Sequence, residues 1–241
     1  MKLSSWGTDL VELLLPAGCI SCGAWIPRGK AELVCGRCRS RFRAAPWPRC
    51  PRCHFPRGAG RPDAPDCLEC RPWSPALAAA RYAFVLATPV DDLVHALKYE
   101  GWPALAGLMG GQLAEIRLPD DDRASVVVPV PTTTNRRRRR GYNQAELLAE
   151  RFAACTGRSL RNALVRRSEG RSQTSLSPAE RRANVRGVFA PNPSVGSLEG
   201  ARVLLVDDVL TTGSTAAEAA TTLAAMGAAH VTLVAFARAL P

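Results

Sequence analysis

The stretch from residue 203 to residue 215 constrains the fold of this chain more than any other part of the sequence, and it reads VLLVDDVLTTGST. It begins with a continuous apolar run, which is typical of a strand buried on both faces of a parallel sheet. We expect this strand to cover residues 201–206 and to end at two adjacent carboxylates, Asp207 and Asp208. Small hydroxyl residues around a glycine follow, and an alanine-rich pattern then predicts a helix over residues 214–226.

The loop between this strand and this helix should bind a phosphate group. Its residues are Thr211, Thr212, Gly213, Ser214 and Thr215. Unpaired backbone amides and the helix dipole at a helix N-terminus favour an anion. The two aspartates would lie a few residues away, where carboxylates suit ribose hydroxyls or a Mg ion. The alternative is an ordinary strand-to-helix turn, but such a turn needs one capping residue and not two acids followed by several hydroxyls. We therefore interpret the segment as a sugar-phosphate site.

Eight of the nine cysteines lie before residue 71, in CxxC pairs. The pairs are Cys19/Cys22, Cys35/Cys38, Cys50/Cys53 and Cys67/Cys70. Each CxxC turn can point two thiolates at one position, and two such turns complete a tetrahedral zinc site. Gaps of 12 residues after the first pair and 13 after the third predict two ribbon-like units in series, each holding one structural zinc. A cross-braced arrangement, in which the first and third pairs share a metal, stays open because spacing alone does not fix the pairing.

The cysteines divide the 241 residues into three expected parts. These are an N-terminal helix over residues 1–15, a double zinc-ribbon module over 16–73 and an α/β domain over 74–241. The early apolar cluster, residues 10–15, is interrupted by Glu12 and does not resemble a secretory signal. No stretch approaches the roughly 20 apolar residues that span a bilayer. We therefore expect a cytoplasmic protein without membrane insertion, whose thiols bind metal rather than form disulfides.

Strand and helix patterns alternate after the cysteine-rich segment. Strands are predicted over residues 81–86, 124–130, 160–165, 201–206 and 230–236, and helices over 89–99, 103–116, 143–155 and 214–226. This alternation predicts an α/β fold with a parallel sheet and helices on both faces. Ligands of such sheets bind beyond the carboxyl ends of the strands, and both Asp207 and Pro131 follow a predicted strand.

The net charge of +11 is concentrated in two segments that flank this predicted site along the chain. One contains five consecutive arginines, residues 136–140, and the other covers residues 161–186. We interpret them as a basic lid over a polyanionic ligand, with a simple solvated surface as the alternative. Arg136 and Arg140 are candidate phosphate ligands, and so is Lys98 on a predicted helix.

Arginines also alternate with aromatic residues in the cysteine-rich segment. The aromatic residues are Trp25, Phe42, Trp47 and Phe55. Arginines with exposed rings suit single-stranded nucleic acid, through neutralised phosphates and stacked bases. The alternative is that the rings form the small core of the module.

The order of these motifs resembles the ComF family. The CxxC pairs are followed by LKY at residues 97–99, RGYNQ at 140–144, the pairs Gln173/Leu176 and Arg181/Asn184, and VDDVLTTGST. The last motif also resembles the phosphoribosyl pyrophosphate (PRPP) motif of type I phosphoribosyltransferases. The resemblance extends from about Cys19 to Ala239 and implies a phosphoribosyltransferase-like domain behind a zinc finger. It further implies a role in competence or the use of imported DNA, with PRPP or a nucleotide, single-stranded DNA and the DNA-uptake machinery as partners.

The resemblance leaves two functions open. One is a DNA-handling protein that binds PRPP or a nucleotide. The other is a Mg-dependent phosphoribosyltransferase that joins PRPP to a nucleobase and releases pyrophosphate. In the enzyme, Asp207 and Asp208 would hold the ribose hydroxyls, while Mg with Arg136 and Arg140 would balance the pyrophosphate charge. Purine-type relatives often place a carboxylate three residues after the second acid, where this chain has Thr211.

Overall fold

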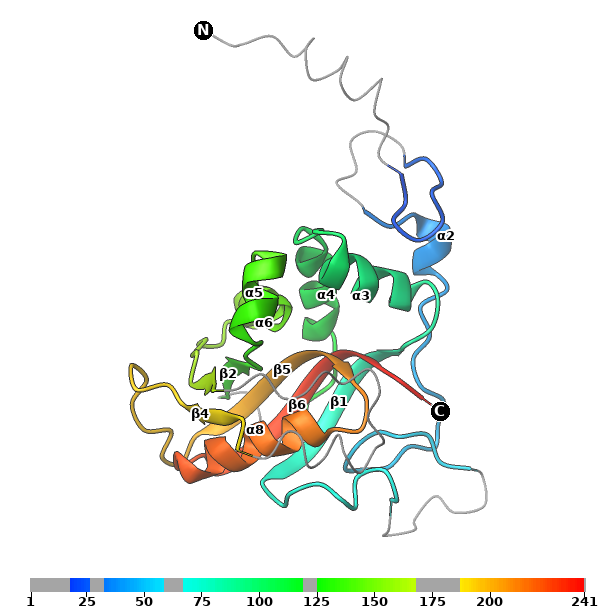
Figure 1. Ribbon diagram of the computed structural model, residues 1–241. Coiled ribbons are helices and arrows are strands. Elements are labelled where there is room, and N and C mark those ends of the chain that lie inside the picture. Colours follow the sequence, from blue (N-terminus) through cyan, green and yellow to red (C-terminus); the bar gives the residue numbers. More distant parts are fainter. Residues whose placement is uncertain (1–17, 27–32, 59–66, 119–124, 168–186, 241) are drawn as a thin grey trace, which may run out of the picture.

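A four-stranded parallel sheet forms the centre of the computed structural model, which describes residues 18–26, 33–58, 67–118, 125–167 and 187–240 (Figure 1). The strands lie in the order β1-β6-β5-β2, and every neighbouring pair is parallel. Their bounds are Leu77–Val85 for β1, Val126–Pro129 for β2, Arg202–Leu210 for β5 and His230–Arg238 for β6. This arrangement confirms the predicted parallel sheet.

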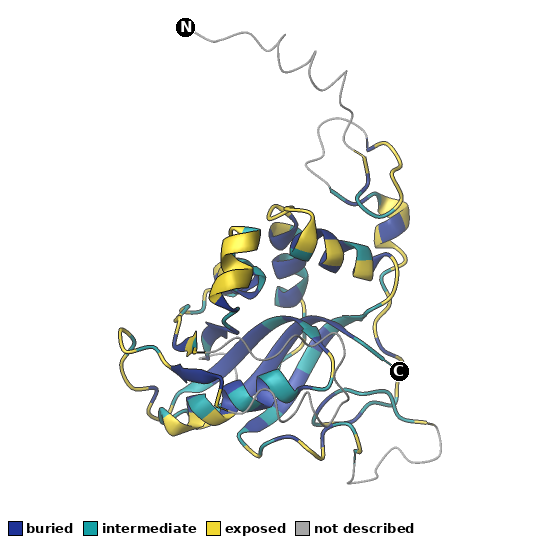
Figure 2. Cartoon of the chain, in the orientation of Figure 1, coloured by how far each residue is buried: buried dark blue, intermediate teal, exposed yellow. Residues whose placement is uncertain are grey.

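Helices cover both faces of the sheet, as predicted (Figure 1). Helices α3 (Val90–Tyr99), α4 (Leu105–Ala114) and α6 (Gln144–Thr156) lie on one face, and α8 (Ser214–Ala225) lies on the other. Because side chains alternate along a strand, Leu204 and Val206 pack toward α3, α4 and α6, while Val203 and Leu205 pack toward α8. Figure 2 shows the resulting buried sheet between helices whose outer faces are exposed.

Several predicted boundaries differ from the structure. Strand β5 runs to Leu210, so Asp207 and Asp208 lie within the strand and not after it. The reason is that their backbone continues to pair with β6 as far as Arg238. The expected helix over residues 1–15 and the segment 168–186 lie outside the described residues.

The strand predicted over residues 160–165 does not join the main sheet as a strand. Leu160 makes only an isolated bridge to Val127. The segment Leu164–Arg166 (β3) instead pairs antiparallel with Phe189–Pro191 (β4) in a separate two-stranded sheet. The apolar pattern therefore indicated a strand here but did not specify its partner. The partner strand, β4, lies more than 20 positions further along the chain.

The two halves of the cysteine-rich segment pack at different places on the α/β domain. The first half, which contains the short helix α2 (Gly36–Arg39), lies beside α3, where Ser21 donates a hydrogen bond to Asp92, and its Cys19 and Cys38 join the same hydrophobic cluster as α3 and α4 (Figure 1). The second half contributes Cys50 and Cys53 to the core on the α8 side. Between them, the chain follows the outer edge of β1, where the carbonyl groups of Arg43 and Arg52 accept hydrogen bonds of 2.7 and 2.8 Å from strand amides. These bonds satisfy part of an edge that would otherwise be open.

Candidate functional site

The two aspartates lie near the carboxyl end of β5, and their carboxylates have different partners. Lys98 Nζ on α3 is 2.9 Å from Asp208 Oδ1, and the Asp208 side chain is only 5% exposed. The second carboxylate oxygen of Asp208, Oδ2, is buried and has no hydrogen-bond partner. The Asp207 carboxylate accepts a hydrogen bond of 2.8 Å from the Asp208 amide. Asp208 therefore holds one buried acceptor whose hydrogen-bonding capacity is unmet.

The charges at this site influence one another. Loss of solvent around Asp207, together with the negative charge of Asp208, raises the pKa of Asp207 to about 7. Burial opposes the charged form of Lys98, but the nearby carboxylates of Asp208 and Asp207 raise the pKa of Lys98 above its ordinary value. Lys98 is therefore a cation at neutral pH that balances the charge of Asp208.

The loop after β5 reaches the N-terminus of α8 through Gly213. This glycine is buried and has a φ of 77°, which lies in the left-handed region that favours glycine. The hydroxyl groups of Thr212 and Ser214 are 2.9 Å apart, and the Ser214 amide donates to the Thr212 hydroxyl. Thr211 is exposed and Thr215 is half-buried. The structure thus places the predicted hydroxyl loop directly beyond the aspartates, at a helix N-terminus.

Trp73 supports this loop and was not singled out from the sequence as a site residue. Its indole Nε1 donates a hydrogen bond of 2.8 Å to the carbonyl oxygen of Thr212. A Cβ atom placed on Gly213 would lie 2.5 Å from the Trp73 ring, so only glycine fits against it. The position of Trp73 soon after Cys70, at the end of the last cysteine pair, was the only signal in the sequence.

The arginine run, which we interpreted from its charge as a lid or a solvated surface, is a helix. Helix α5 (Thr134–Arg140) begins at Thr133, whose side chain accepts a hydrogen bond from the Arg136 amide, and ends at Gly141 with a φ of 83°. None of its residues is buried (Figure 2). Arginine is a good helix former, and these two capping residues define the ends of the helix.

Arg140 connects this helix to α3. Its guanidinium lies 5.1 Å from the centre of the Tyr99 ring and donates a hydrogen bond of 2.8 Å to Gln144 Oε1. Burial lowers the pKa of Arg140, while the charges of Tyr99 and Asp208 oppose that effect. The Tyr142 hydroxyl donates a hydrogen bond of 2.6 Å to the Leu97 carbonyl oxygen. The LKY and RGYNQ motifs, separate in the sequence, therefore lie against each other beside the aspartates.

Arg166 at the end of β3 is a further basic residue near the aspartates. Burial and the charge of Arg136 lower the pKa of Arg166, while Asp207 opposes that effect. Its guanidinium lies 5.4 Å from the Phe189 ring centre, and its Nε atom is buried without a hydrogen-bond partner. The sequence indicated only a basic segment here, because a β3–β4 pairing is needed to hold Arg166 in place.

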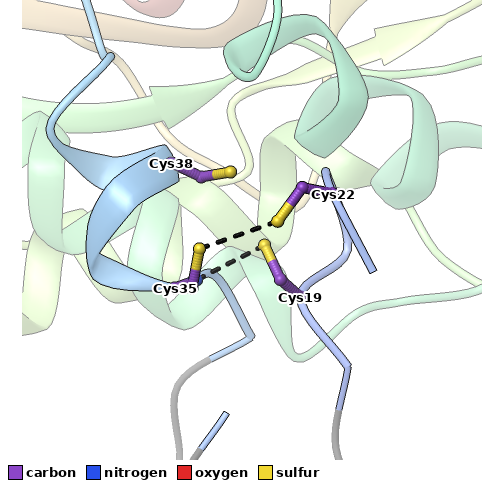
Figure 3. A group of neighbouring side chains, drawn as sticks. All are labelled: Cys19, Cys22, Cys35 and Cys38. Carbon is purple, nitrogen blue, oxygen red and sulfur yellow. Dashed lines mark hydrogen bonds between the residues drawn. The ribbon is translucent and has the colours of Figure 1, made fainter. Parts of the chain in front are cut away.

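The cysteines form two groups that follow the order of the chain. The described sulfur atoms of Cys19, Cys22, Cys35 and Cys38 lie within 4.8 Å of one another, and so do those of Cys50, Cys53, Cys67 and Cys70. This geometry matches the pairing in series and not the cross-braced alternative. Figure 3 shows the first group, in which Cys22 and Cys35 sulfur atoms are 3.7 Å apart.

Both groups fit a four-thiolate metal site. Sulfur–sulfur distances in the second group are 3.6 Å for Cys53 and Cys67 and 3.9 Å for Cys50 and Cys70. A tetrahedron with metal–sulfur bonds of about 2.3 Å has edges of about 3.8 Å, which agrees with these values. The Cys35 amide also donates to Cys19 Sγ at 3.4 Å. Each group can therefore hold one metal ion with no open position for a substrate.

None of the described helices is both long enough and apolar enough to cross a membrane.

Comparisons with known proteins match most of the chain. Residues 114–240 match the phosphoribosyl transferase domain family. The chain is 34% identical to a DNA utilization protein, YhgH, of Salmonella typhi, over 76% of this chain and 80% of that protein. It is 28% identical to competence protein F of Haemophilus influenzae, over 92% of this chain and 96% of that protein. It is also 28% identical to competence protein ComFC of Bacillus subtilis, over 76% of this chain and 75% of that protein.

Proposed function

The chain belongs to the ComF family of competence and DNA-utilisation proteins and carries their phosphoribosyltransferase domain. We propose that it binds PRPP or a related nucleotide together with single-stranded DNA. The observation that carries the PRPP part of this proposal is the buried, unpartnered Oδ2 atom of Asp208, three residues before the first residue of the hydroxyl loop, Thr211. A buried carboxylate oxygen without a partner is costly, and a ribose hydroxyl or a cation would satisfy it.

The ligand would lie across the carboxyl end of β5. The amides and hydroxyls from Thr211 to Thr215 would bind the 5-phosphate at the start of α8, where the helix dipole favours an anion. Asp207 and Asp208 would accept hydrogen bonds from the ribose hydroxyls. Lys98 orients Asp208 through their 2.9 Å contact.

The pyrophosphate would lie toward the basic side of the site. Arg140 and Arg166 lie near Asp208 and Asp207, and Arg136 extends from α5 close to Arg166. The two aspartates are suitable oxygen ligands for a Mg ion, which would neutralise pyrophosphate charge when bound. The chain itself supplies the positive charge that attracts and orients the polyanion.

Single-stranded DNA binding is supported by charge and by family. The chain carries a net charge of +11, and its similarity to DNA utilization and competence proteins covers most of its length. A single strand is attracted by arginines that neutralise its phosphates and release bound counterions.

Calorimetry with PRPP and Mg on metal-replete protein tests the nucleotide part. We expect measurable binding heat for the wild-type chain and its loss in the variant with Asp207→Asn and Asp208→Asn, because the amides cannot replace both acceptors and charges. Asp91→Asn removes an exposed acid from α3 and should bind as the wild type does. Absence of heat from the wild-type protein would refute the proposed PRPP site.

Two further measurements separate the functions. Affinity for a single-stranded oligonucleotide should fall by orders of magnitude between roughly 50 and 200 mM salt if several phosphates are neutralised. Salt-insensitive or absent binding contradicts the DNA part. Release of pyrophosphate with one of a set of nucleobases, lost in the double aspartate variant, would instead identify a phosphoribosyltransferase.

A further inference from the structure

A groove of about 580 Å³ lies on the outer side of β1, away from the aspartates. Its walls come from the segment around Trp47 to His54, from residues 81–84 of β1 and from the end of α4 with the residues that follow it. Strand β6 separates β1 from β5, which carries the aspartates. The groove is therefore distinct from the proposed PRPP site.

Trp47 is the most exposed large aromatic residue in the part of the chain that the structure describes, with 73% of its surface accessible. The Arg49 guanidinium lies 4.7 Å from the centre of the Trp47 ring. The His54 ring is in an edge arrangement with it, and the two ring centres are 6.1 Å apart. Arg49 is itself held by the Ala45 carbonyl oxygen. A tryptophan exposed to this degree contributes little to a core, yet here its orientation is held by two neighbours.

The chemistry of the groove combines positive charge with an apolar floor. Three arginines line it, Arg49, Arg81 and Arg117, against one carboxylate, Glu115. Apolar side chains also line it, namely Phe84, Ile116 and Leu118. Cations around an aromatic platform and an apolar floor match a ligand that alternates phosphates with flat rings.

We propose that this groove binds single-stranded nucleic acid, with a base stacked on Trp47 and the adjacent phosphates contacting Arg49, Arg81 and Arg117. A single strand is favoured over a duplex because only an unpaired base offers its face to a side chain. Positive charge elsewhere on the chain would attract the strand without distinguishing its bases, whereas this groove would contact the bases themselves. The inference rests on the proposed DNA binding and assigns a location to it.

Comparison of two oligonucleotides isolates the stacking. A short oligo-dT and an abasic strand of equal length carry the same phosphates, so their affinity ratio reports contacts to bases. We expect the wild-type chain to prefer oligo-dT by about tenfold, the order of one stacked base. Trp47→Ala should abolish this preference, while affinity for the abasic strand stays within about twofold.

Trp25→Ala is the matched control. Trp25 is also exposed, at 61%, but it lies next to the first cysteine group, in a bridge with Gly18, and does not line the groove. It should retain the preference for oligo-dT. Thermal unfolding of both variants checks that each remains folded, which we expect because both side chains are largely in solvent.

The charge of the groove is tested with a second pair. Arg117→Ala and Arg37→Ala each remove one exposed arginine, the first from the groove and the second from α2. Arg117→Ala should weaken oligo-dT binding by several-fold and reduce the slope of log affinity against log salt by about 1, since one phosphate contact is lost. Arg37→Ala should change neither.

The outcomes separate this inference from the proposed function. If the wild-type protein binds no single strand, DNA binding itself is refuted. If it binds oligo-dT but Trp47→Ala and Arg117→Ala behave like their controls, DNA binds elsewhere and only the groove is refuted. If the wild type shows no preference for oligo-dT over the abasic strand, base stacking in the groove is refuted.

Discussion

Gly213 is required for the conformation of the proposed phosphate loop. It needs a positive φ, and it leaves no room for a side chain next to Trp73. The positive φ is required by the turn into α8. The lack of a side chain is required by Trp73, which lies 139 positions before Thr212 in the sequence. A glycine in this loop is therefore required by the local turn and by the tertiary contact at the same time.

Substitution of Gly213 should disturb that loop. In Gly213→Ala, the new Cβ must displace the Trp73 ring, and the alanine must keep a positive φ that is unfavourable for it. We therefore expect the free energy of unfolding to fall by about 1–3 kcal/mol. PRPP affinity should fall as well, because the Thr212 carbonyl loses its indole partner. Gly107→Ala is the control, since that exposed α4 glycine has open space around it. Equal stability and PRPP affinity in both variants would contradict the close contact.

Asp207 should make the stability of the fold depend on pH. Its pKa is raised from 3.8 to about 7 in the folded chain, so the folded state binds a proton that the unfolded state releases near pH 4. This contribution is fully present below about pH 4 and is lost as the pH rises through about 7. Urea unfolding at several pH values should show that the free energy of unfolding declines less between about pH 4 and 7 in Asp207→Asn than in the wild type. Parallel curves for the two proteins would exclude the raised pKa.

At the scale of elements, the second cysteine group is a support for the proposed phosphate loop. Arg52, inside the third CxxC turn, donates to the carbonyl oxygens of Cys70, Ser74 and Leu77 at 3.0, 3.0 and 2.8 Å. The segment that these bonds hold carries Trp73, which contacts the loop. The Ser74 hydroxyl also accepts a hydrogen bond of 3.0 Å from Thr221 on α8. A metal in this group would therefore stabilise the start of α8 as well as its own turns.

Removal of one metal site at a time should reveal this dependence. Cys67→Ser should lower the bound metal by one ion per chain and weaken PRPP binding, because Trp73 loses its support. Cys22→Ser should lower the metal content equally but affect PRPP binding less, since the first group packs beside α3 and belongs to a different hydrophobic cluster from Trp73. Elemental analysis and calorimetry measure the two effects. Equal loss of PRPP affinity in both variants would contradict a specific role for the second group.

Helix α5 illustrates where reasoning about elements from the sequence was incomplete. A run of five arginines was interpreted by its charge, as a lid or a solvated surface. The capping residues Thr133 and Gly141 were both visible in the sequence and would have predicted a short helix. The contact of Arg140 with Tyr99 could not be predicted in the same way, because it depends on how α5 and α3 pack.

At the scale of the molecule, the first cysteine group packs beside α3 and the second packs into the core on the α8 side of the sheet, and the chain between them follows the edge of β1. The groove around Trp47 is formed by this route, since it lies between that segment, the strand and the end of α4. The exposed aromatic residues expected for nucleic acid therefore differ in their surroundings: Trp47 lines a groove, while Phe42 packs 5.0 Å from Phe84 in an edge contact. The core interpretation is confirmed for Phe42, while the nucleic-acid interpretation stays a prediction for Trp47.

The sequence by itself determined the parallel sheet and the acid pair followed by a hydroxyl loop, and it favoured the serial pairing of the cysteines, which the sulfur positions then decided. These features depend on hydrophobic period and on short spacings, which act between residues close in the chain. Only the tertiary structure decided that Lys98 contacts Asp208, that Trp73 closes over Gly213 and that a groove forms at Trp47. Such contacts depend on which faces meet after folding, and that is settled by packing across the whole core rather than by any local pattern.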